Sequence, residues 1–153
     1  MIDMDKNMDL SGKKVAVLGI GVENEALIPY LLNGGASVVI ADRKTREELG
    51  DVYQRLKERK VSWRLGSHYL ENLDDFDVIF RTPGIPVYNK YIQAAKRNGV
   101  EITSEIKLFF EKCPAPIIGV TGTKGKGTTS TLITKMLEVD GKRVFLGGNI
   151  GRP

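Results

Sequence analysis

The sequence has few of the features on which secreted and membrane proteins depend. Its single cysteine, Cys113, excludes an internal disulfide bond, which is typical of proteins from a reducing compartment. No apolar run approaches the roughly 18 residues that a membrane-spanning helix needs. The acidic N-terminus, with Asp3, Asp5 and Asp9, also lacks the apolar core of a signal peptide. We therefore expect a cytoplasmic protein with no membrane partner.

A large excess of charge of one sign is also missing. The 153 residues include 23 Lys and Arg against 19 Asp and Glu, and the basic residues are interspersed with acidic ones. A nucleic-acid-binding module stays an alternative on charge alone, but small ligands that carry phosphate explain the net charge of +4 equally well. We expect no nucleic-acid partner. The apolar content of 41% suffices for the core of one domain, with room for part of a second.

One glycine-rich stretch carries the clearest functional signal. The apolar run at 116–120 predicts a buried strand, and a helical pattern follows at 128–139. Between them, glycine N–H groups and the start of the helix can bind phosphate oxygens, as in a P-loop. The residues predicted to bind ATP in this way are Gly122, Thr123, Lys124, Gly125, Lys126, Gly127 and Thr128.

Lys126 is the predicted catalytic residue of this loop, and a hydroxyl that follows it is the predicted metal ligand. Lys126 would reach the β- and γ-phosphates, and Thr128 or Thr129 would offer a hydroxyl to Mg²⁺. The match is to a variant of the P-loop motif, because Gly127 directly follows the lysine where Ser or Thr is usual, and Val120 stands at the place of the first glycine. The alternative is an ordinary strand-to-helix turn with two solvated lysines.

The N-terminal part of the chain predicts a nucleotide-binding βαβ unit. A strand at 13–18 leads into Gly19-Ile20-Gly21-Val22-Glu23-Asn24, where Asn24 occupies the third glycine position of G-x-G-x-x-G. The next strand, at 37–41, ends at Asp42, where an acid can accept hydrogen bonds from a ribose or a base. Two alternatives stay open: a nicotinamide-dinucleotide-binding domain, and a structural role in which the glycines serve packing and Asp42 caps a loop.

Three further strands complete the predicted sheet, at 61–65, 77–81 and 100–103. Helical patterns precede the first of them, at 45–60, and the last, at 89–98. Ligands of an open α/β sheet bind outside the carboxyl ends of its strands. The turn that follows residue 81 is therefore expected at the same edge as the first glycine turn and Asp42. Taken alone, this Thr-Pro-Gly turn is equally explained by ordinary turn chemistry.

A proline-rich boundary, Cys113-Pro114-Ala115-Pro116, interrupts any regular element, so we expect domains at 1–113 and 114–153. The predicted fold class is α/β. A Rossmann-like open parallel sheet of about five strands, flanked by helices, would be followed by the first βαβ piece of a P-loop ATPase domain. This second piece, with its last strand at 143–146, is too short to bury a core of its own, so we expect it to be truncated.

The segment at 104–112 closes the first predicted domain. Its apolar residues recur at roughly helical spacing, and we expect all of them in the core: Ile106, Leu108, Phe109 and Phe110.

In the order of these motifs the chain resembles the N-terminal part of the Mur ligase family, over essentially all of its length. The first three turns match, but the specific signal is the pair formed by Gly-Thr-Lys-Gly-Lys at 122–126 and Gly-Gly-Asn-Ile-Gly at 147–151. The resemblance implies a UDP-sugar in the first domain and ATP with Mg²⁺ in the second. The residues that it assigns to the UDP-sugar are Gly21, Val22 and Glu23 beside the diphosphate, Asp42, Arg43 and Lys44 around the uracil, Thr82, Pro83 and Gly84 in the nucleotide pocket, and Asn149 where the domains meet.

The reaction that the resemblance implies is ATP-dependent amide formation through an acyl phosphate, in peptidoglycan precursor synthesis and hence in cell shape and division. The nearest likeness is to the members that add D-glutamate to UDP-N-acetylmuramoyl-L-alanine. The family's metal-binding acids, modified lysine and amino-acid-binding domain would lie beyond Pro153, so this chain is expected to bind UDP-sugar as a monomer without catalysing. Another Mur-type ligase stays open, and the Gly-Lys-Gly-Thr spelling at 125–128 is also like folylpolyglutamate synthases.

Overall fold

The computed structural model describes residues 9–148. It divides into two compact units that meet between Lys112 and Cys113, named here unit 1 (up to Lys112) and unit 2 (from Cys113). Within the described residues, no helix combines the length and the apolar composition that crossing a membrane requires.

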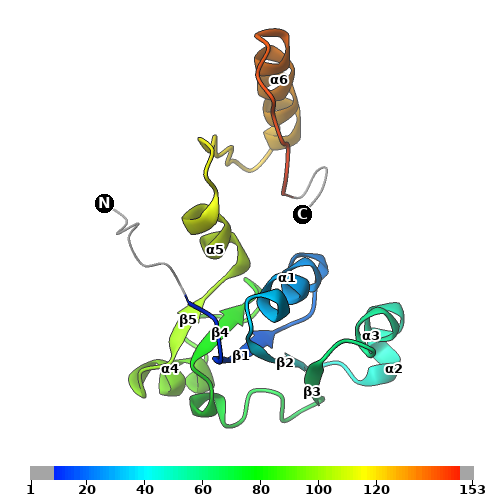
Figure 1. Cartoon of the computed structure of the whole chain (residues 1–153), viewed down its shortest axis with the longest axis vertical. Helices are drawn as coiled ribbons and strands as arrows, with labels where there is room; N and C mark the ends of the chain where they lie inside the picture. The colour runs from blue at the N-terminus through cyan, green and yellow to red at the C-terminus, as the bar shows by residue number, and fades with distance from the viewer. Residues whose placement is uncertain (1–8, 149–153) are drawn as a thin grey trace. The chain divides into compact units, whose positions relative to one another are not determined.

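Unit 1 is built on an open sheet of five parallel strands in the order β3-β2-β1-β4-β5 (Figure 1). The strands are β1 (Lys14–Leu18), β2 (Ser37–Asp42), β3 (Val61–Leu65), β4 (Val78–Arg81) and β5 (Glu101–Thr103). The predicted Rossmann-like sheet flanked by helices is confirmed. β1 has a nearly continuous apolar sequence because both faces of a parallel sheet are covered, and its last four residues are 0% exposed.

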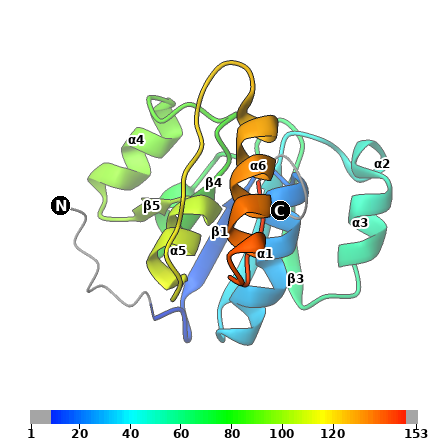
Figure 2. The same cartoon turned by 90° about the horizontal axis from the view of Figure 1, so that it is seen from above.

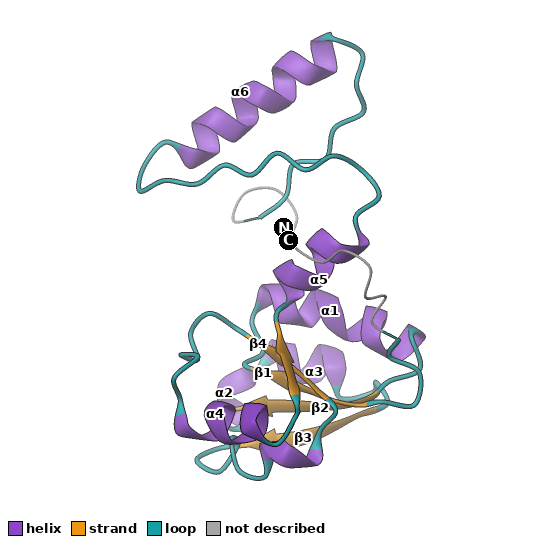
Figure 3. Cartoon of the chain, turned by 90° about the vertical axis from the view of Figure 1, so that its left-hand side faces the viewer, coloured by secondary structure: helices purple, strands orange, loops and turns teal. Residues whose placement is uncertain are grey.

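Helices cover both faces of this sheet. The helices are α1 (Val22–Asn33), α2 (Arg46–Leu49), α3 (Asp51–Leu56), α4 (Lys90–Arg97) and α5 (Glu105–Lys112), with a short 3₁₀ turn at Leu73–Asp75. One core cluster joins Val17 and Phe80 to α1, α3 and α5, and the other joins Leu18 and Ile79 to α4. Figures 1 and 3 accordingly show α1 and α5 on one side of the sheet and α4 on the other.

The single helix predicted at 45–60 is wrong. The segment forms two short helices, α2 and α3, which meet at Gly50 with φ +51°, outside the helical range. A capping box starts α2, since the Thr45 N–H donates to Glu48 Oε2 at 2.8 Å and the Glu48 N–H donates to Thr45 Oγ1. The segment has the sequence pattern of a helix, but the backbone conformation of Gly50 ends α2 and separates it from α3.

The expectation that all four apolar residues of α5 lie in the core is also wrong. Only Leu108 is buried, at 4% exposed, while Ile106, Phe109 and Phe110 are 54%, 49% and 46% exposed. At about 100° per residue, Ile106 and Phe110 both lie about 200° around the helix from Leu108, on the opposite side. The sheet covers one narrow stripe of α5, so the other apolar side chains stay at the surface.

Unit 2 contains one helix among its described residues, α6 (Lys126–Val139) (Figure 3). The strands predicted at 116–120 and 143–146 are not formed, and the only strand-like feature of residues 113–148 is an isolated bridge at Gly147. None of these residues is buried. A strand needs a paired neighbour and a covered face, whereas a helix satisfies its own backbone, so α6 forms and the flanking strands do not.

Candidate functional site

The strands β1 and β4 are paired neighbours in the middle of the sheet, and their carboxyl ends lie side by side. From β1 the chain builds outward through β2 and β3, and it then returns to place β4 and β5 on the other side of β1. Figure 2 shows the result, with α2 and α3 beside β3 and α4 beside β5. The carboxyl ends of β1 and β4 therefore form a topological switch point, where open α/β sheets bind their ligands.

The turns that follow these two strands pack directly on each other. Gly19 has φ +80°, and a Cβ placed there would lie 2.9 Å from Thr82 Oγ1. The Thr82 N–H donates to the Leu18 carbonyl at 3.2 Å. Glycine at position 19 is thus required by its backbone conformation and by its neighbour. The structure brings together the 19–21 and 82–85 turns, as the sequence predicts for one sheet edge.

Asn24 holds the start of the first turn. Its side chain is 2% exposed, and its Nδ2 donates to the Gly19 carbonyl at 2.7 Å and to the Leu18 carbonyl at 3.4 Å. In the sequence this residue is recognisable only as the one that stands at the third glycine position. The available signal was a polar residue at a position where the fingerprint expects close packing of helix against strand.

Asp42 holds the same turn from the neighbouring strand. It is 9% exposed, and its Oδ2 accepts from the Ile20 N–H at 2.7 Å, across 22 residues of sequence. Its Oδ1 accepts from the Lys44 N–H at 2.8 Å, and the side chains of Arg43 and Lys44 are exposed. A carboxylate has about four acceptor sites, so a ligand can still donate to Asp42, and its predicted contact with the uracil stays a prediction.

The N-terminus of α1 opens at this edge. Its N-cap is Gly21, which has an extended backbone, and no side chain caps the helix. A Cβ at Gly21 would have no atom of the described residues within 4 Å, so the protein leaves room directly beside this glycine. The N–H groups of residues 22–24 have no acceptor within the helix, and they lie at the positive end of its dipole. This arrangement fits a diphosphate.

Arg81, which the sequence analysis did not single out, supports the turn after β4. Its Nη1 donates to the Thr82 carbonyl at 2.9 Å and also to the Ile85 carbonyl. Ile85 is buried, whereas Pro83 and Gly84 are exposed. The guanidinium therefore fixes both ends of the turn and leaves its middle residues accessible at the sheet edge.

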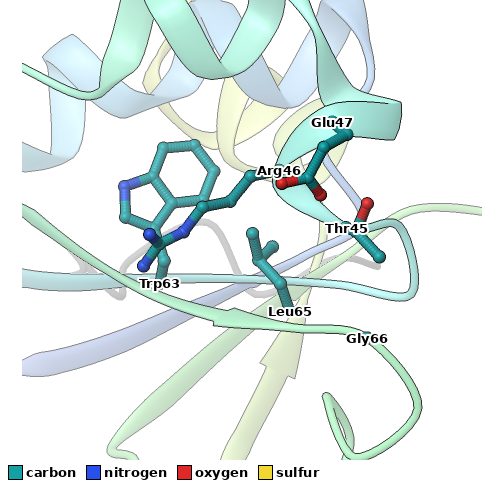
Figure 4. Close-up of a pocket in the computed structure, with 6 residues that line it drawn as sticks. All are labelled: Thr45, Arg46, Glu47, Trp63, Leu65 and Gly66. Carbon is teal, nitrogen blue, oxygen red and sulfur yellow. The ribbon is translucent and has the colours of Figure 1, made fainter.

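A surface pocket of about 330 Å³ lies at the β2–β3 side of unit 1 (Figure 4). It is lined by Thr45, Arg46, Glu47, Trp63, Leu65 and Gly66. None of the predicted site residues lines it, although Asp42, Arg43 and Lys44 directly precede it in the chain. The half-buried ring of Trp63 packs against Tyr53, with ring centroids 4.9 Å apart. We place the candidate site at the switch point for two reasons. The helix that begins at the pocket, α2, has only four residues, and no residue of β1 or β4 lines the pocket.

The glycine loop of unit 2 is a second candidate site. Gly125 has φ +77° and is the N-cap of α6, and no side chain caps this helix either. The Nζ of Lys126 donates to the Gly122 carbonyl at 2.6 Å, and Thr128 is exposed in the first turn. A free helix N-terminus, an ammonium and a hydroxyl fit a triphosphate with a divalent cation. Among the described residues, no three His, Cys, Asp or Glu side chains gather to hold a metal, and Asn149 lies outside these residues.

The sheet order and the switch point of unit 1 define a Rossmann-like domain with an open, uncapped helix start at its ligand edge. The family model described as "Mur ligase MurD-like, N-terminal domain" matches residues 13–104, more than half of the chain. The chain belongs to this family.

Curated relatives extend the likeness into unit 2. Proteins of Clostridium novyi and Clostridium botulinum, both named UDP-N-acetylmuramoylalanine–D-glutamate ligase, are 44% and 48% identical over 94% and 92% of this chain. The chain spans only 31% of the length of either relative. Among solved structures, a pseudomurein peptide ligase type C from Methanothermus fervidus aligns with a TM-score of 0.52 at 26% identity, over 85% of this chain and 27% of that one.

Proposed function

We propose that this chain is part of an ATP-dependent ligase of peptidoglycan precursor synthesis, which adds D-glutamate to UDP-N-acetylmuramoyl-L-alanine. The shared name of the relatives supports this assignment of the reaction. The structural observation that carries it is the open α1 N-terminus at the switch point of a domain that belongs to the Mur ligase family. We propose a cytoplasmic, monomeric protein, whose partners are these small molecules.

Unit 1 would bind the UDP-sugar. The diphosphate would lie against the first-turn N–H groups of α1, and Gly21 would allow it to approach because it has no side chain there. The uracil would lie near Asp42, with the exposed cations of Arg43 and Lys44 beside the nucleotide. The exposed middle of the Thr82-Pro83-Gly84 turn would form the opposite wall.

Unit 2 would bind ATP through the 122–128 loop. ATP would supply the phosphoryl group that activates the substrate carboxylate for amide formation. The ammonium of Lys126 would exchange its bond to the Gly122 carbonyl for bonds to phosphate oxygens. The hydroxyl of Thr128 would bind Mg²⁺, and the aligned N–H groups at the start of α6 would add positive potential.

A titration tests the role of unit 1. We expect the chain to bind UDP-N-acetylmuramoyl-L-alanine in calorimetry and to show no comparable affinity for NADH. The nicotinamide alternative is supported by the positions of Gly19, Gly21 and Asp42, but Asn24 fills the place of the third glycine. Tight binding of NADH, without any effect of the UDP-sugar, would reject the ligase proposal.

Gly21→Val is the variant that locates the ligand. Gly21 has a negative φ and open space around it, so valine fits the backbone but covers the helix start. We expect a native fold and strongly weakened UDP-sugar binding. Gly119→Val in unit 2, also in open space and without a positive φ, is the matched control and should bind normally. If both variants bound the UDP-sugar with equal affinity, the diphosphate could not lie against the N-terminus of α1.

Amino-acid-dependent release of phosphate tests the reaction. The assay uses a protein that carries this chain together with the further length that the relatives have. With UDP-N-acetylmuramoyl-L-alanine and ATP present, D-glutamate should stimulate release, and Lys126→Ala should abolish it. Stimulation by a different amino acid alone would point to another member of the Mur ligases.

A further inference from the structure

Two buried side chains hold the backbone of Leu18, Gly19 and Ile20 from opposite sides. From α1, the Asn24 amide donates to the Gly19 carbonyl at 2.7 Å and to the Leu18 carbonyl at 3.4 Å. From the end of β2, the Asp42 carboxylate accepts from the Ile20 N–H at 2.7 Å. Both side chains are at most 9% exposed, so these bonds form in a low-dielectric setting where they are strong.

These bonds decide which polar groups of the turn can face an anion. A backbone carbonyl directed at a phosphate would repel it, and Asn24 engages the carbonyls of both Leu18 and Gly19. The Leu18 carbonyl also accepts from the Thr82 N–H. Asp42 uses its negative charge on Ile20 and Lys44 within the protein. The open N–H groups of the next residues, at the start of α1, are then left to the ligand.

We infer that Asn24 and Asp42 are a pair of positioning residues, which preform the 19–21 turn for a diphosphate. The inference rests on the proposed function, because it assumes that the α1 N-terminus receives the diphosphate of a nucleotide. It gives Asp42 a role other than contact with the base. It also gives Asn24 a role that glycine at this position could not perform. A preformed turn binds more tightly because no ordering of the loop has to accompany binding.

The test compares Asp42→Asn with Asp77→Asn, using UDP and inorganic pyrophosphate as probes. Asp77 is the matched control because its Oδ2 accepts from the Lys14 N–H at 2.8 Å, which is the same kind of bond at the other end of β1. If Asp42 positions the turn, D42N should lower the affinity for UDP and the affinity for pyrophosphate by the same factor, about tenfold. D77N should leave both affinities unchanged. If D42N lowers the affinity for UDP but not for pyrophosphate, Asp42 contacts the nucleoside and the inference fails.

Amide hydrogen exchange separates this inference from the proposed function. In D42N the Ile20 amide should exchange faster than in the wild type, and in D77N it should not. A wild-type chain that binds neither probe would reject the proposed function, while unchanged exchange at Ile20 would reject the positioning role. Asn24→Asp and Asn24→Gly remove the donor from the other side and should show the same loss for both probes. Wild-type affinity in N24G would overturn the inference, even if D42N failed to fold.

Discussion

Both units contain a glycine turn that leads into a helix without a side-chain cap, but the two turns are supported differently. In unit 1 local bonds such as that from Asn24 to Gly19 are joined by bonds between distant parts of the chain, as between Asp42 and Ile20, 22 residues apart. In unit 2 the Lys126 bond to Gly122 spans four residues. Similar local sequence patterns therefore produce a turn fixed by tertiary structure in one unit and a turn fixed by local contacts in the other.

The burial of the two units explains this difference. β1 of unit 1 lies between two paired strands and under helices on both faces, and its last four residues are inaccessible to solvent. Residues 113–148 include no buried residue at all. In α6, the hydroxyls of Ser130 and Thr134 instead donate to carbonyls one turn earlier in the same helix. The glycine turn of unit 1 can form hydrogen bonds to residues distant in sequence because the sheet brings those residues beside it.

The largest expected contrast comes from removing an aromatic ring in each unit. Phe80, in β4, is 0% exposed, and Phe80→Ala should lower the free energy of unfolding of unit 1 by about 3–5 kcal/mol through lost burial and a cavity. Phe145, in unit 2, is 84% exposed, so Phe145→Ala should change stability by less than about 0.5 kcal/mol. Urea unfolding followed by the fluorescence of Trp63, the single tryptophan, reports on unit 1, and circular dichroism of the same samples also registers α6 of unit 2. Similar losses in both variants would contradict the contrast in burial.

The glycine turns themselves give the next contrast. Gly19→Ala and Gly125→Ala both place a Cβ at a positive φ, of +80° and +77°. Only the Cβ at position 19 meets another residue, Thr82 Oγ1 at 2.9 Å. We expect Gly19→Ala to cost about 1–3 kcal/mol more than Gly125→Ala, as overpacking does, measured by denaturant unfolding.

A second substitution in the same turn checks that the clash is the cause. In Gly19→Ala with Thr82→Ala, the hydroxyl and methyl groups that approach most closely are gone, and the remaining Thr82 Cβ lies 3.7 Å away. The double variant should therefore recover part of the loss. If the changes in the free energy of unfolding of the two single variants were strictly additive, the clash between positions 19 and 82 would not be the cause.

A smaller effect of opposite sign is expected at the end of β5. Thr103 is 5% exposed, and its Oγ1 has no hydrogen-bond partner among the described residues. Thr103→Val keeps the shape and removes the unpaired hydroxyl, so unit 1 should become more stable by about 1 kcal/mol. Thr134 of α6 is the comparison, because its hydroxyl donates to the Ser130 carbonyl at 2.9 Å. A stability gain in Thr134→Val, with none in Thr103→Val, would reverse this expectation.

The smallest expected effect concerns ion pairs at the surface. In unit 1 the Arg55 guanidinium bonds both oxygens of Glu25, at 2.6 and 2.9 Å, and holds the pKa of that carboxyl below its ordinary value. Because the folded pKa is the lower one, the pair stabilises unit 1 above the pKa of the unfolded state, about 4.3. This stabilisation is lost as the pH falls through the folded pKa.

Glu25→Gln should accordingly be less stable than the wild type at pH 7 and equally stable at pH 2, in urea unfolding at low salt. Asp140 of unit 2 is 3.7 Å from Lys142, and its side chain is 71% exposed. Asp140→Asn should leave the stability at pH 7 almost unchanged, since exposed pairs contribute little. A gap between Glu25→Gln and the wild type that persists at pH 2 would have another cause.

The sheet of unit 1 could be predicted because its signals are local and agree with one another. The strands β1, β2 and β4 are short, largely apolar runs bounded by turn residues, and the acid and glycines at the strand ends mark one edge. The two errors in unit 1 have geometric causes. The apolar residues of the segment, Leu49, Val52, Tyr53 and Leu56, keep helical spacing across Gly50, so the spacing does not reveal the break that this glycine makes. α5 carries more apolar residues than one sheet face can cover.

The roles of Asn24 and Arg81 could not be predicted from their neighbours in sequence. Asn24 bonds carbonyls that a helical turn and the preceding loop bring beneath it, and Arg81 reaches across its own turn to the Ile85 carbonyl. In the sequence, the first is only a departure from a motif and the second is one basic residue among 23 Lys and Arg.

Taken alone, the amino-acid order determined the strand-forming runs of unit 1 and the helix after each glycine turn, because each depends on contacts within a few residues. Tertiary structure decided whether a predicted strand exists, which side chains are buried and how the carboxylate of Asp42 is used. The physical reason is that a strand cannot satisfy its backbone or cover its faces by itself. Where five strands pair, their turns become fixed in space, whereas residues 113–148 form no strand and keep only the helix α6.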